Sequence, residues 1–263
     1  MQLQDSQIHA GKLALSAGRG PVYGPLTFDL DGGLTVLRGD PGSGRTSLLL
    51  TLAGRMKHDA GSLTVGGLPL PRSLRAVQKA TAIAGFDGID ELEESVTVAA
   101  ALRERQAWLS PWWQVVRTPN DVAVAALCAD VFGAEPIPRA DAVIWDLDET
   151  QHFLLRVTLA LMSAPAILFV DDVEQLRSTE GRAAVWERLA HISRGSTAVV
   201  VSASSWDAQL WAELDIAPAL VDLNESRARG AAEAAEAAGS GTADEDLAET
   251  DPATASLVKE LIP

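Results

Sequence analysis

Residues 39–47 read GDPGSGRTS, a glycine-rich stretch with the spacing of a phosphate-binding loop. The pattern G-x-x-x-x-G-[basic]-[Ser/Thr] is met, with Arg45 in the place usually taken by lysine. Glycines let backbone N–H groups turn toward phosphate oxygens, and a following helix N-terminus adds its positive dipole end. The alternative is a chance turn before a helix. We predict a nucleotide-phosphate site formed by Gly39, Asp40, Pro41, Gly42, Ser43, Gly44, Arg45, Thr46 and Ser47.

Two carboxylates, Asp171 and Asp172, follow the apolar run 167–170. Charged side chains rarely end a buried strand without a purpose, so a metal site is favoured over a simple helix cap. Carboxylate and hydroxyl oxygens are ligands that Mg²⁺ accepts beside nucleotide phosphates. We therefore predict that Thr46 and Asp171 are ligands of Mg²⁺.

Short apolar runs and helical patterns alternate along the chain, which is typical of an α/β fold with a mainly parallel sheet. The expected strands are 34–37, 167–170, 198–201 and, more weakly, 82–86. The expected helices are 45–53, 96–109, 151–162 and 181–192. The first 35 residues and 62–70 are short extended pieces broken by Gly and Pro, and they predict a small antiparallel sheet.

The composition excludes some classes of function. The 263 residues carry a formal net charge of −15, which argues against a broad basic surface for nucleic acid and against direct adsorption to anionic lipid. We expect no signal peptide and no membrane span, so that any role at a membrane needs a partner. Cys128 is the single cysteine, and we expect it to be a small buried apolar residue.

The phosphate loop continues as LLLTLAGRMKHDAGSLTVGGLPL, and residues 147–176 read LDETQHFLLRVTLALMSAPAILFVDDVEQL. In this layout, over about residues 3–222, the chain resembles the nucleotide-binding domains of the ATP-binding cassette (ABC) transporters. The resemblance implies a P-loop NTPase domain over 1–223 with a helical subdomain at about 88–164. It implies ATP and Mg²⁺ as cofactors, and a transmembrane subunit with a possible second ABC subunit as partners. It also implies a cytoplasmic location at the inner face of the membrane, reached through that partner.

Several catalytic positions of the family are altered here. Asp172 stands where the family has the glutamate that polarises the attacking water, so it is the catalytic candidate although one methylene shorter. Glu174, two residues on, is not expected to point at the phosphate. The family's histidine after the strand 198–201 is replaced by Ala203 or Ser204, and its glutamine after 82–86 is replaced by acidic residues.

Two further family features are changed. No aromatic side chain for stacking on adenine lies near residues 16–18, and Tyr23 is a weak substitute. Residues 147–151, LDETQ, replace the signature Leu-Ser-Gly-Gly-Gln, which we call the signature segment. Two carboxylates would repel a triphosphate, whereas Asp148 with Gln151 three residues later forms a helix capping box. We predict that this segment builds structure.

Two hypotheses follow for the function: an ATP-binding transport subunit of weak or partner-dependent activity, or a regulatory pseudo-ATPase without turnover. Trp108, Trp112 and Trp113 either meet the membrane partner or fill the core of the helical subdomain. The composition of 224–263 predicts an acidic, disordered tail.

Overall fold

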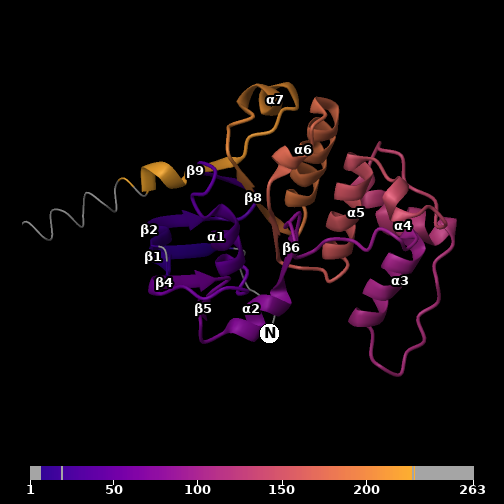
Figure 1. Ribbon diagram of the computed structural model, residues 1–263, viewed down its shortest axis with the longest axis horizontal. Coiled ribbons are helices and arrows are strands. Elements are labelled where there is room, and N and C mark those ends of the chain that lie inside the picture. Colours follow the sequence, from indigo (N-terminus) through magenta and orange to yellow (C-terminus); the bar gives the residue numbers. More distant parts are fainter. Residues whose placement is uncertain (1–6, 19, 227, 229–263) are drawn as a thin grey trace, which may run out of the picture.

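The computed structural model describes residues 7–18, 20–226 and 228, and two β-sheets lie at its centre (Figure 1). The larger sheet is parallel, with strand order β6-β7-β8-β3-β9. Its strands are β3 (Leu34–Arg38), β6 (Thr81–Ala84), β7 (Ile167–Val170), β8 (Ala198–Ala203) and β9 (Ala219–Asp222). Because β8 lies between β7 and β3, the loops that follow these three strands meet at one edge of the sheet.

The smaller sheet is antiparallel, with strand order β2-β1-β4-β5. It comprises β1 (Ile8–Ala17), β2 (Gly20–Leu30), β4 (Ala60–Val65) and β5 (Leu68–Leu70). Helix α1 (Arg45–Leu52) packs between the two sheets, and residues 48–52 of this helix are buried. Their cluster includes Ile167 and Phe169, every second residue of β7. The apolar stripe of α1 therefore fixes the phosphate loop above the parallel sheet.

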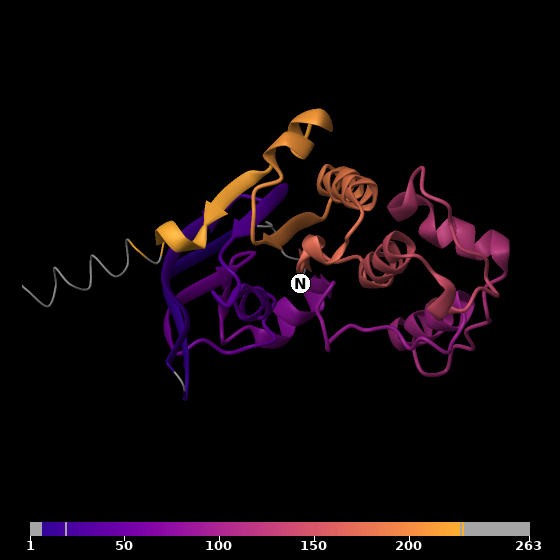
Figure 2. The same cartoon turned by 45° about the horizontal axis from the view of Figure 1, so that its top comes forward.

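The other helices are α2 (Leu74–Ala80), α3 (Val98–Leu109), α4 (Asp121–Phe132), α5 (Glu149–Leu161), α6 (Thr179–Ser193) and α7 (Ala208–Glu213), with short 3₁₀ turns at Ile144–Asp146 and Val173–Gln175. Helices α3, α4 and α5 gather at the end of the molecule away from the antiparallel sheet (Figures 1 and 2). They share a second core with the opposite face of the parallel sheet, formed in part by Leu168 and Val170. Cys128 is buried in this core, as expected, and burial raises its pKa to about 11.

The predicted α/β fold is confirmed, and the four expected strands and four expected helices are present with bounds shifted by a few residues. Sequence reasoning missed β9, α2, α4 and α7. Strand β9 has only four residues, two of them exposed, so it lacks the apolar run that revealed the others. Residues 223–226 form a helical turn, and the rest of the predicted tail, except Ala228, lies outside the described residues.

None of the helices in the described part of the chain has both the length and the apolar character that crossing a bilayer requires.

Candidate nucleotide-binding site

The phosphate loop, residues 39–47, turns sharply between β3 and α1. The N–H of Gly39 donates to the carbonyl of Ala203 at 3.1 Å, and the N–H of Ser43 donates to the carbonyl of Asp40 at 2.9 Å. Gly44, with φ of 86°, is the N-cap of α1 and offers no side-chain cap. The first-turn N–H groups of a helix have no intrahelical acceptor, so those of α1 are left for an external acceptor such as phosphate.

Gly44 is also fixed by packing. A Cβ at this position would lie 2.5 Å from the carbonyl oxygen of Val22, whereas a Cβ on Gly42 would meet nothing within 4 Å. Both glycines have positive φ. Gly42 is therefore required by backbone conformation alone, and Gly44 by conformation and close contact with β2.

The two predicted magnesium ligands are in contact. Thr46 Oγ1 donates to Asp171 Oδ2 at 2.6 Å, and the hydroxyl of Ser202 donates to Asp171 Oδ1. Asp171 is buried, because it follows the fully buried strand β7. A hydroxyl and a carboxylate oxygen thus face each other beside the N-terminus of α1. A divalent ion held there would take its remaining ligands from phosphate and water, which is how proteins commonly bind Mg²⁺.

Asp172, the catalytic candidate, has a left-handed backbone conformation with φ of 58° and ψ of 73°. Its N–H donates to Ser202 Oγ at 3.2 Å. Its Oδ1 is buried, and among the described residues no hydrogen-bond donor reaches it. Burial raises the pKa of Asp172, and the neighbouring Arg45 guanidinium opposes this rise. The carboxyl group thus lies close to the loop arginine in a poorly solvated position.

Arg45 faces Glu174, a residue that sequence reasoning had no reason to place beside the phosphate loop. Arg45 Nη1 lies 3.8 Å from Glu174 Oε2, and the two side chains are only 13% and 18% exposed. The Glu174 carboxylate accepts from the hydroxyls of Ser204 and Ser205 at 2.6 and 2.8 Å, and from both of their backbone N–H groups. Although burial raises the pKa of Glu174, these hydrogen bonds outweigh it and hold the pKa below its usual value.

The acidic stretch after β6, where the resemblance implies a glutamine, forms an ion pair with α5. Asp90 accepts from the N–H groups of Gly85 and Phe86, just after β6, at 3.0 and 2.7 Å. It also pairs with Arg156 of α5 at 2.6 Å. The acidic residue here thus has a structural partner, which sequence reasoning did not find because the two residues are 66 positions apart.

Solved structures of ABC ATPase domains are similar to this chain in fold. CbiO1 from Clostridium perfringens, part of the ABC transporter complex CbiONQ, has a TM-score of 0.61 and 15% identity, covering 77% of this chain and 80% of its own. A bacterial Atm1-family ABC exporter with ATP bound has a TM-score of 0.62 and 12% identity, covering 85% of this chain and 38% of its own. The fold is that of an ABC-type ATPase domain.

Curated proteins give the same relationship at the level of sequence. The Nod factor export ATP-binding protein I of Mesorhizobium japonicum is 25% identical over 189 residues, which are 71% of this chain and 53% of that protein. The cytochrome c biogenesis ATP-binding export protein CcmA of Xanthomonas axonopodis is 40% identical over 68 residues, 26% of this chain and 32% of that protein.

The chain spans about half the length of the Nod factor relatives it matches. No protein-family model matches the chain. The chain is a divergent relative of ABC transporter ATP-binding proteins.

The signature segment of this ABC relative begins helix α5. Asp148 is the N-cap, its carboxylate accepts from the N–H of Gln151 at 2.8 Å, and the Gln151 side chain accepts from the N–H of Asp148. The predicted capping box is therefore confirmed. Glu149 is engaged as well, because it accepts from the backbone N–H of Arg177 at 3.0 Å and lies 3.7 Å from its guanidinium.

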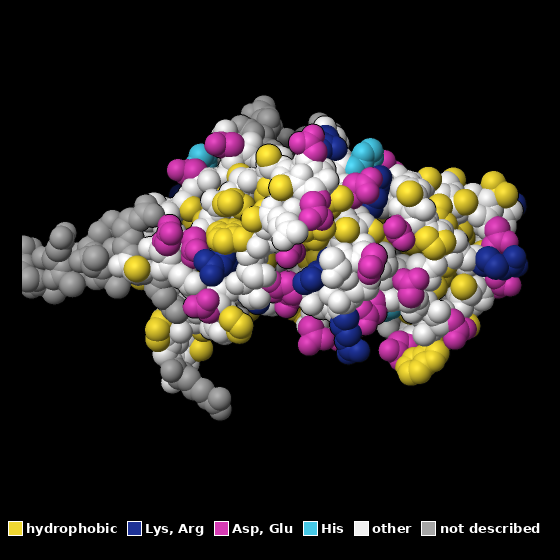
Figure 3. Space-filling model, turned by 90° about the horizontal axis from the view of Figure 1, so that it is seen from above, with side chains coloured by type: hydrophobic (Ala, Val, Ile, Leu, Met, Phe, Trp, Pro, Cys, Tyr) yellow, Lys and Arg dark blue, Asp and Glu magenta, His cyan; other side chains and the backbone are white. Residues whose placement is uncertain are grey.

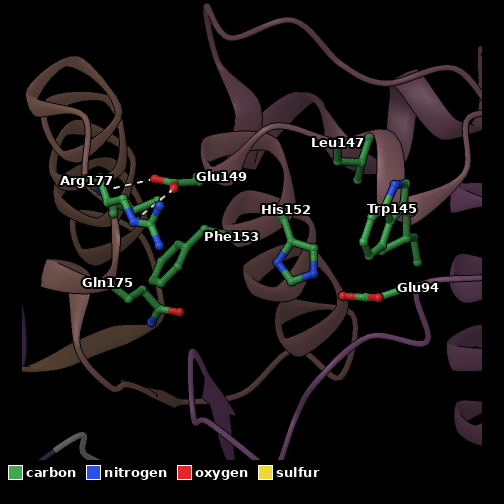
Figure 4. A pocket seen from close by; sticks show the side chains of 10 residues that line it. Glu94, Trp145, Leu147, Glu149, His152, Phe153, Gln175 and Arg177 are labelled. Carbon is green, nitrogen blue, oxygen red and sulfur yellow. Dashed lines mark hydrogen bonds and ion pairs between the residues drawn. The ribbon is translucent and has the colours of Figure 1, made fainter.

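Beside the signature segment lies a pocket of about 310 Å³ (Figure 4). In the close-up, Glu149 and Arg177 lie at one side and Trp145 and Glu94 at the other, with His152 between them. Burial lowers the pKa of His152, as does the charge of Arg156. The pocket is lined by Glu94, Ile144, Trp145, Leu147, Glu149, His152, Phe153, Gln175, Leu176 and Arg177.

The exposed fractions of four aromatic side chains decide two of the predictions made from the sequence. Tyr23 does not substitute for an adenine-stacking residue, because it is 1% exposed and its hydroxyl donates to Thr51 Oγ1 at 2.8 Å in the core. Trp108, Trp112 and Trp113 are 78%, 92% and 70% exposed, so the alternative that they fill the core of the helical subdomain is wrong. We call residues 108–113 the tryptophan segment.

Proposed function

We propose that this chain is the ATP-binding subunit of an ABC transporter-like membrane complex, which binds Mg-ATP and has weak or partner-dependent hydrolysis. The observation that carries the proposal is the contact of Thr46 with Asp171 at 2.6 Å, beside the uncapped N-terminus of α1. A phosphate-binding loop next to a hydroxyl–carboxylate pair is what a Mg-nucleotide requires. The fold of an ABC ATPase domain supports the same assignment.

The residues present fit the phosphate groups of a nucleotide. Ser43 Oγ and Arg45 Nη1 are buried, and in the ranges that the structure describes they find no hydrogen-bond partner. Buried polar atoms are normally hydrogen-bonded, and the 3.8 Å ion pair of Arg45 Nη1 with Glu174 is too long to be a hydrogen bond. Two buried loop atoms without a hydrogen bond therefore favour a polar ligand at this place. Residues 39–47 would hold the phosphates, while Thr46 and Asp171 would hold Mg²⁺. When bound, the metal would supply charge that stabilises the phosphoryl oxygens.

Weak hydrolysis follows from the groups around the loop. Asp172 is shorter than the family's glutamate, and its carboxylate is disfavoured by burial. Arg45 already has a carboxylate partner, and the carboxylates of the signature segment are used within the chain. These same observations favour the second candidate, a regulatory or scaffolding pseudo-ATPase that binds nucleotide without turnover.

A membrane subunit is the partner we infer, with residues 88–164 acting as the helical subdomain that meets it. The exposed tryptophan segment supports this, because large aromatic side chains are enriched at the centres of protein interfaces. Trp108 and Trp112 border a groove of about 580 Å³ along α3. On the face seen in Figure 3, Lys and Arg side chains lie singly among acidic ones, which fits a protein partner better than an anionic surface.

Titration calorimetry with Mg-ATP tests the binding site. The wild-type chain is expected to bind in the micromolar to millimolar range, and Thr46→Ala is expected to weaken binding at least tenfold. Thr118→Ala is the matched control, because Thr118 is exposed on the loop before α4. No heat with the wild type, or equal affinity of Thr46→Ala and the wild type, would reduce the loop to a structural feature.

Phosphate release by the purified chain tests the pseudo-ATPase candidate. The isolated chain is expected to hydrolyse ATP near background, close to the rates of Asp172→Asn and Thr46→Ala. A rate well above both variants would show that Asp172 is a competent base and exclude the pseudo-ATPase.

In light scattering with ATP the chain is expected to stay monomeric, because the signature segment caps its own helix.

A further inference from the structure

We propose that Glu174 is a built-in anion of the phosphate site, which pairs with Arg45 and makes the site prefer a nucleoside diphosphate to a triphosphate. The inference rests on the nucleotide binding proposed above and adds a specificity-determining residue to it. No sequence motif marks Glu174, and only the meeting of the loops after β7 and β8 brings it to the phosphate loop.

The first argument is the position of the pair. In phosphate loops the basic residue reaches the β- and γ-phosphates, and Arg45 occupies that position here. Its guanidinium lies 3.8 Å from Glu174 Oε2, at an enclosed place where neither side chain is more than 18% exposed. A terminal phosphate that pairs with Arg45 must therefore share it with a carboxylate or displace that carboxylate.

The second argument is that Glu174 is held firmly. The hydroxyl of Ser204 donates to Oε2 at 2.6 Å, and the hydroxyl of Ser205 donates to Oε1 at 2.8 Å. The backbone N–H groups of both serines donate to the same carboxylate at 2.9–3.1 Å. Charge-assisted hydrogen bonds of this kind are among the stronger ones, so the carboxylate stays charged and in place.

The third argument is the local balance of charge. Asp171, Asp172 and Glu174 present three carboxylates near one guanidinium, that of Arg45. Mg²⁺ at Thr46 and Asp171 would offset two of these charges, but Glu174 would still face the added charge of a γ-phosphate. A diphosphate ends at its β-phosphate, which the loop N–H groups and the helix N-terminus can hold without crowding Glu174. Repulsion by the Glu174 carboxylate therefore weakens the binding of a triphosphate more than the binding of a diphosphate.

The experiment is calorimetry with Mg-ADP and Mg-ATP on the full chain and on three variants. Glu174→Gln removes the charge and keeps an acceptor for the serines. Ser204→Ala/Ser205→Ala keeps the charge and removes two of its tethers. Glu180→Gln is the matched control, because Glu180 lies in the first turn of α6 and accepts from Ser178 Oγ at 2.8 Å, but is exposed. Circular dichroism and thermal melting establish that each variant folds.

The wild type is expected to bind Mg-ADP about tenfold more tightly than Mg-ATP. Glu174→Gln is expected to bring the two affinities within about threefold, chiefly by tightening Mg-ATP, and the double serine variant is expected to lie between. Glu180→Gln is expected to keep the wild-type ratio.

A wild-type ratio near one, or an unchanged ratio in Glu174→Gln, would overturn the inference while leaving nucleotide binding intact. Absence of binding by every protein would overturn the proposed function and this inference together. Binding of Mg-ATP by Glu174→Gln, with no binding of either nucleotide by the wild type, would overturn the inference, because the wild-type site would then not hold a diphosphate.

Discussion

Arg156 of helix α5 and Asp90 of the loop after β6 form an ion pair of 2.6 Å, in which the two side chains are 5% and 20% exposed. Arg156 also donates to the carbonyl of Phe86 at 3.0 Å and to Gln175 Oε1 at 3.4 Å. The pair thus joins α5 to the loops that follow β6 and β7. Helix α5 carries the signature segment at its N-terminus, so the ion pair connects the helix that bears this segment to the parallel sheet.

Replacing Asp90 by Ala is expected to lower the free energy of unfolding by about 3 kcal/mol or more. The change leaves the Arg156 guanidinium buried without its counter-charge, and such losses typically cost about 3–5 kcal/mol. It also removes the acceptor of the Gly85 and Phe86 N–H groups. Urea denaturation measures the change, with Asp87→Ala, an exposed carboxylate three residues away, as the control. Equal losses in both variants would contradict the role of the pair.

Replacing Asp172 by Asn is expected to stabilise the fold at neutral pH by roughly 0.5–2 kcal/mol, the usual size of a stabilising single change. Burial raises the pKa of Asp172 in the folded state, so its ionised form destabilises that state above the raised pKa. As the pH falls through the raised pKa, Asp172 takes up a proton and this destabilisation decreases. It is absent once the pH reaches the ordinary pKa of an aspartate, about 3.9. Asn also tolerates the left-handed backbone of this residue.

Urea denaturation of the wild type and Asp172→Asn across this pH range checks the prediction. The stability difference should be largest at pH 7 and shrink on acidification. Asp172→Ala, which removes the charge but fits the left-handed conformation poorly, should gain less. A difference that grows on acidification would show that the carboxylate is stabilised in the folded protein.

Alanine substitution should separate the two loop glycines. Gly42→Ala is expected to cost about 1 kcal/mol, the strain of a left-handed alanine, because its Cβ meets nothing within 4 Å. Gly44→Ala is expected to cost about 3 kcal/mol or more, since the same strain is joined by a clash with the carbonyl of Val22. Thermal and urea denaturation compare the two. If both variants lost the same stability, close packing of the loop against β2 would not be limiting.

The capping box makes its own prediction for the signature segment. Asp148→Ala is expected to destabilise the protein by about 1 kcal/mol, because the N–H of Gln151 loses its acceptor at the start of α5. Asp146→Ala, an exposed carboxylate two residues earlier, is expected to change stability by no more than about 0.5 kcal/mol. A stabilised Asp148→Ala variant would indicate that Asp148 is retained for a ligand or partner at the expense of the fold.

Sequence alone determined the class of fold and the place of the predicted phosphate loop between a strand and a helix. The apolar runs at 34–37, 167–170 and 198–201 are long enough and apolar enough to be buried strands, whichever strands they pair with. The glycines of the loop at 39–47 determine its local geometry, so the sequence was sufficient to predict this loop at the start of a helix. The capping box was equally local, because its two residues are three positions apart.

Tertiary structure decided the partners of the charged and aromatic side chains. Glu174 meets Arg45 and the two serines only because β8 is inserted between β7 and β3, and strand order is not encoded in any local pattern. The pairing of Asp90 with Arg156 and the exposure of the tryptophan segment have the same origin. Each depends on which surfaces are covered by segments distant in sequence. Propensity and periodicity report how a segment folds locally, and they carry no information on what packs against it.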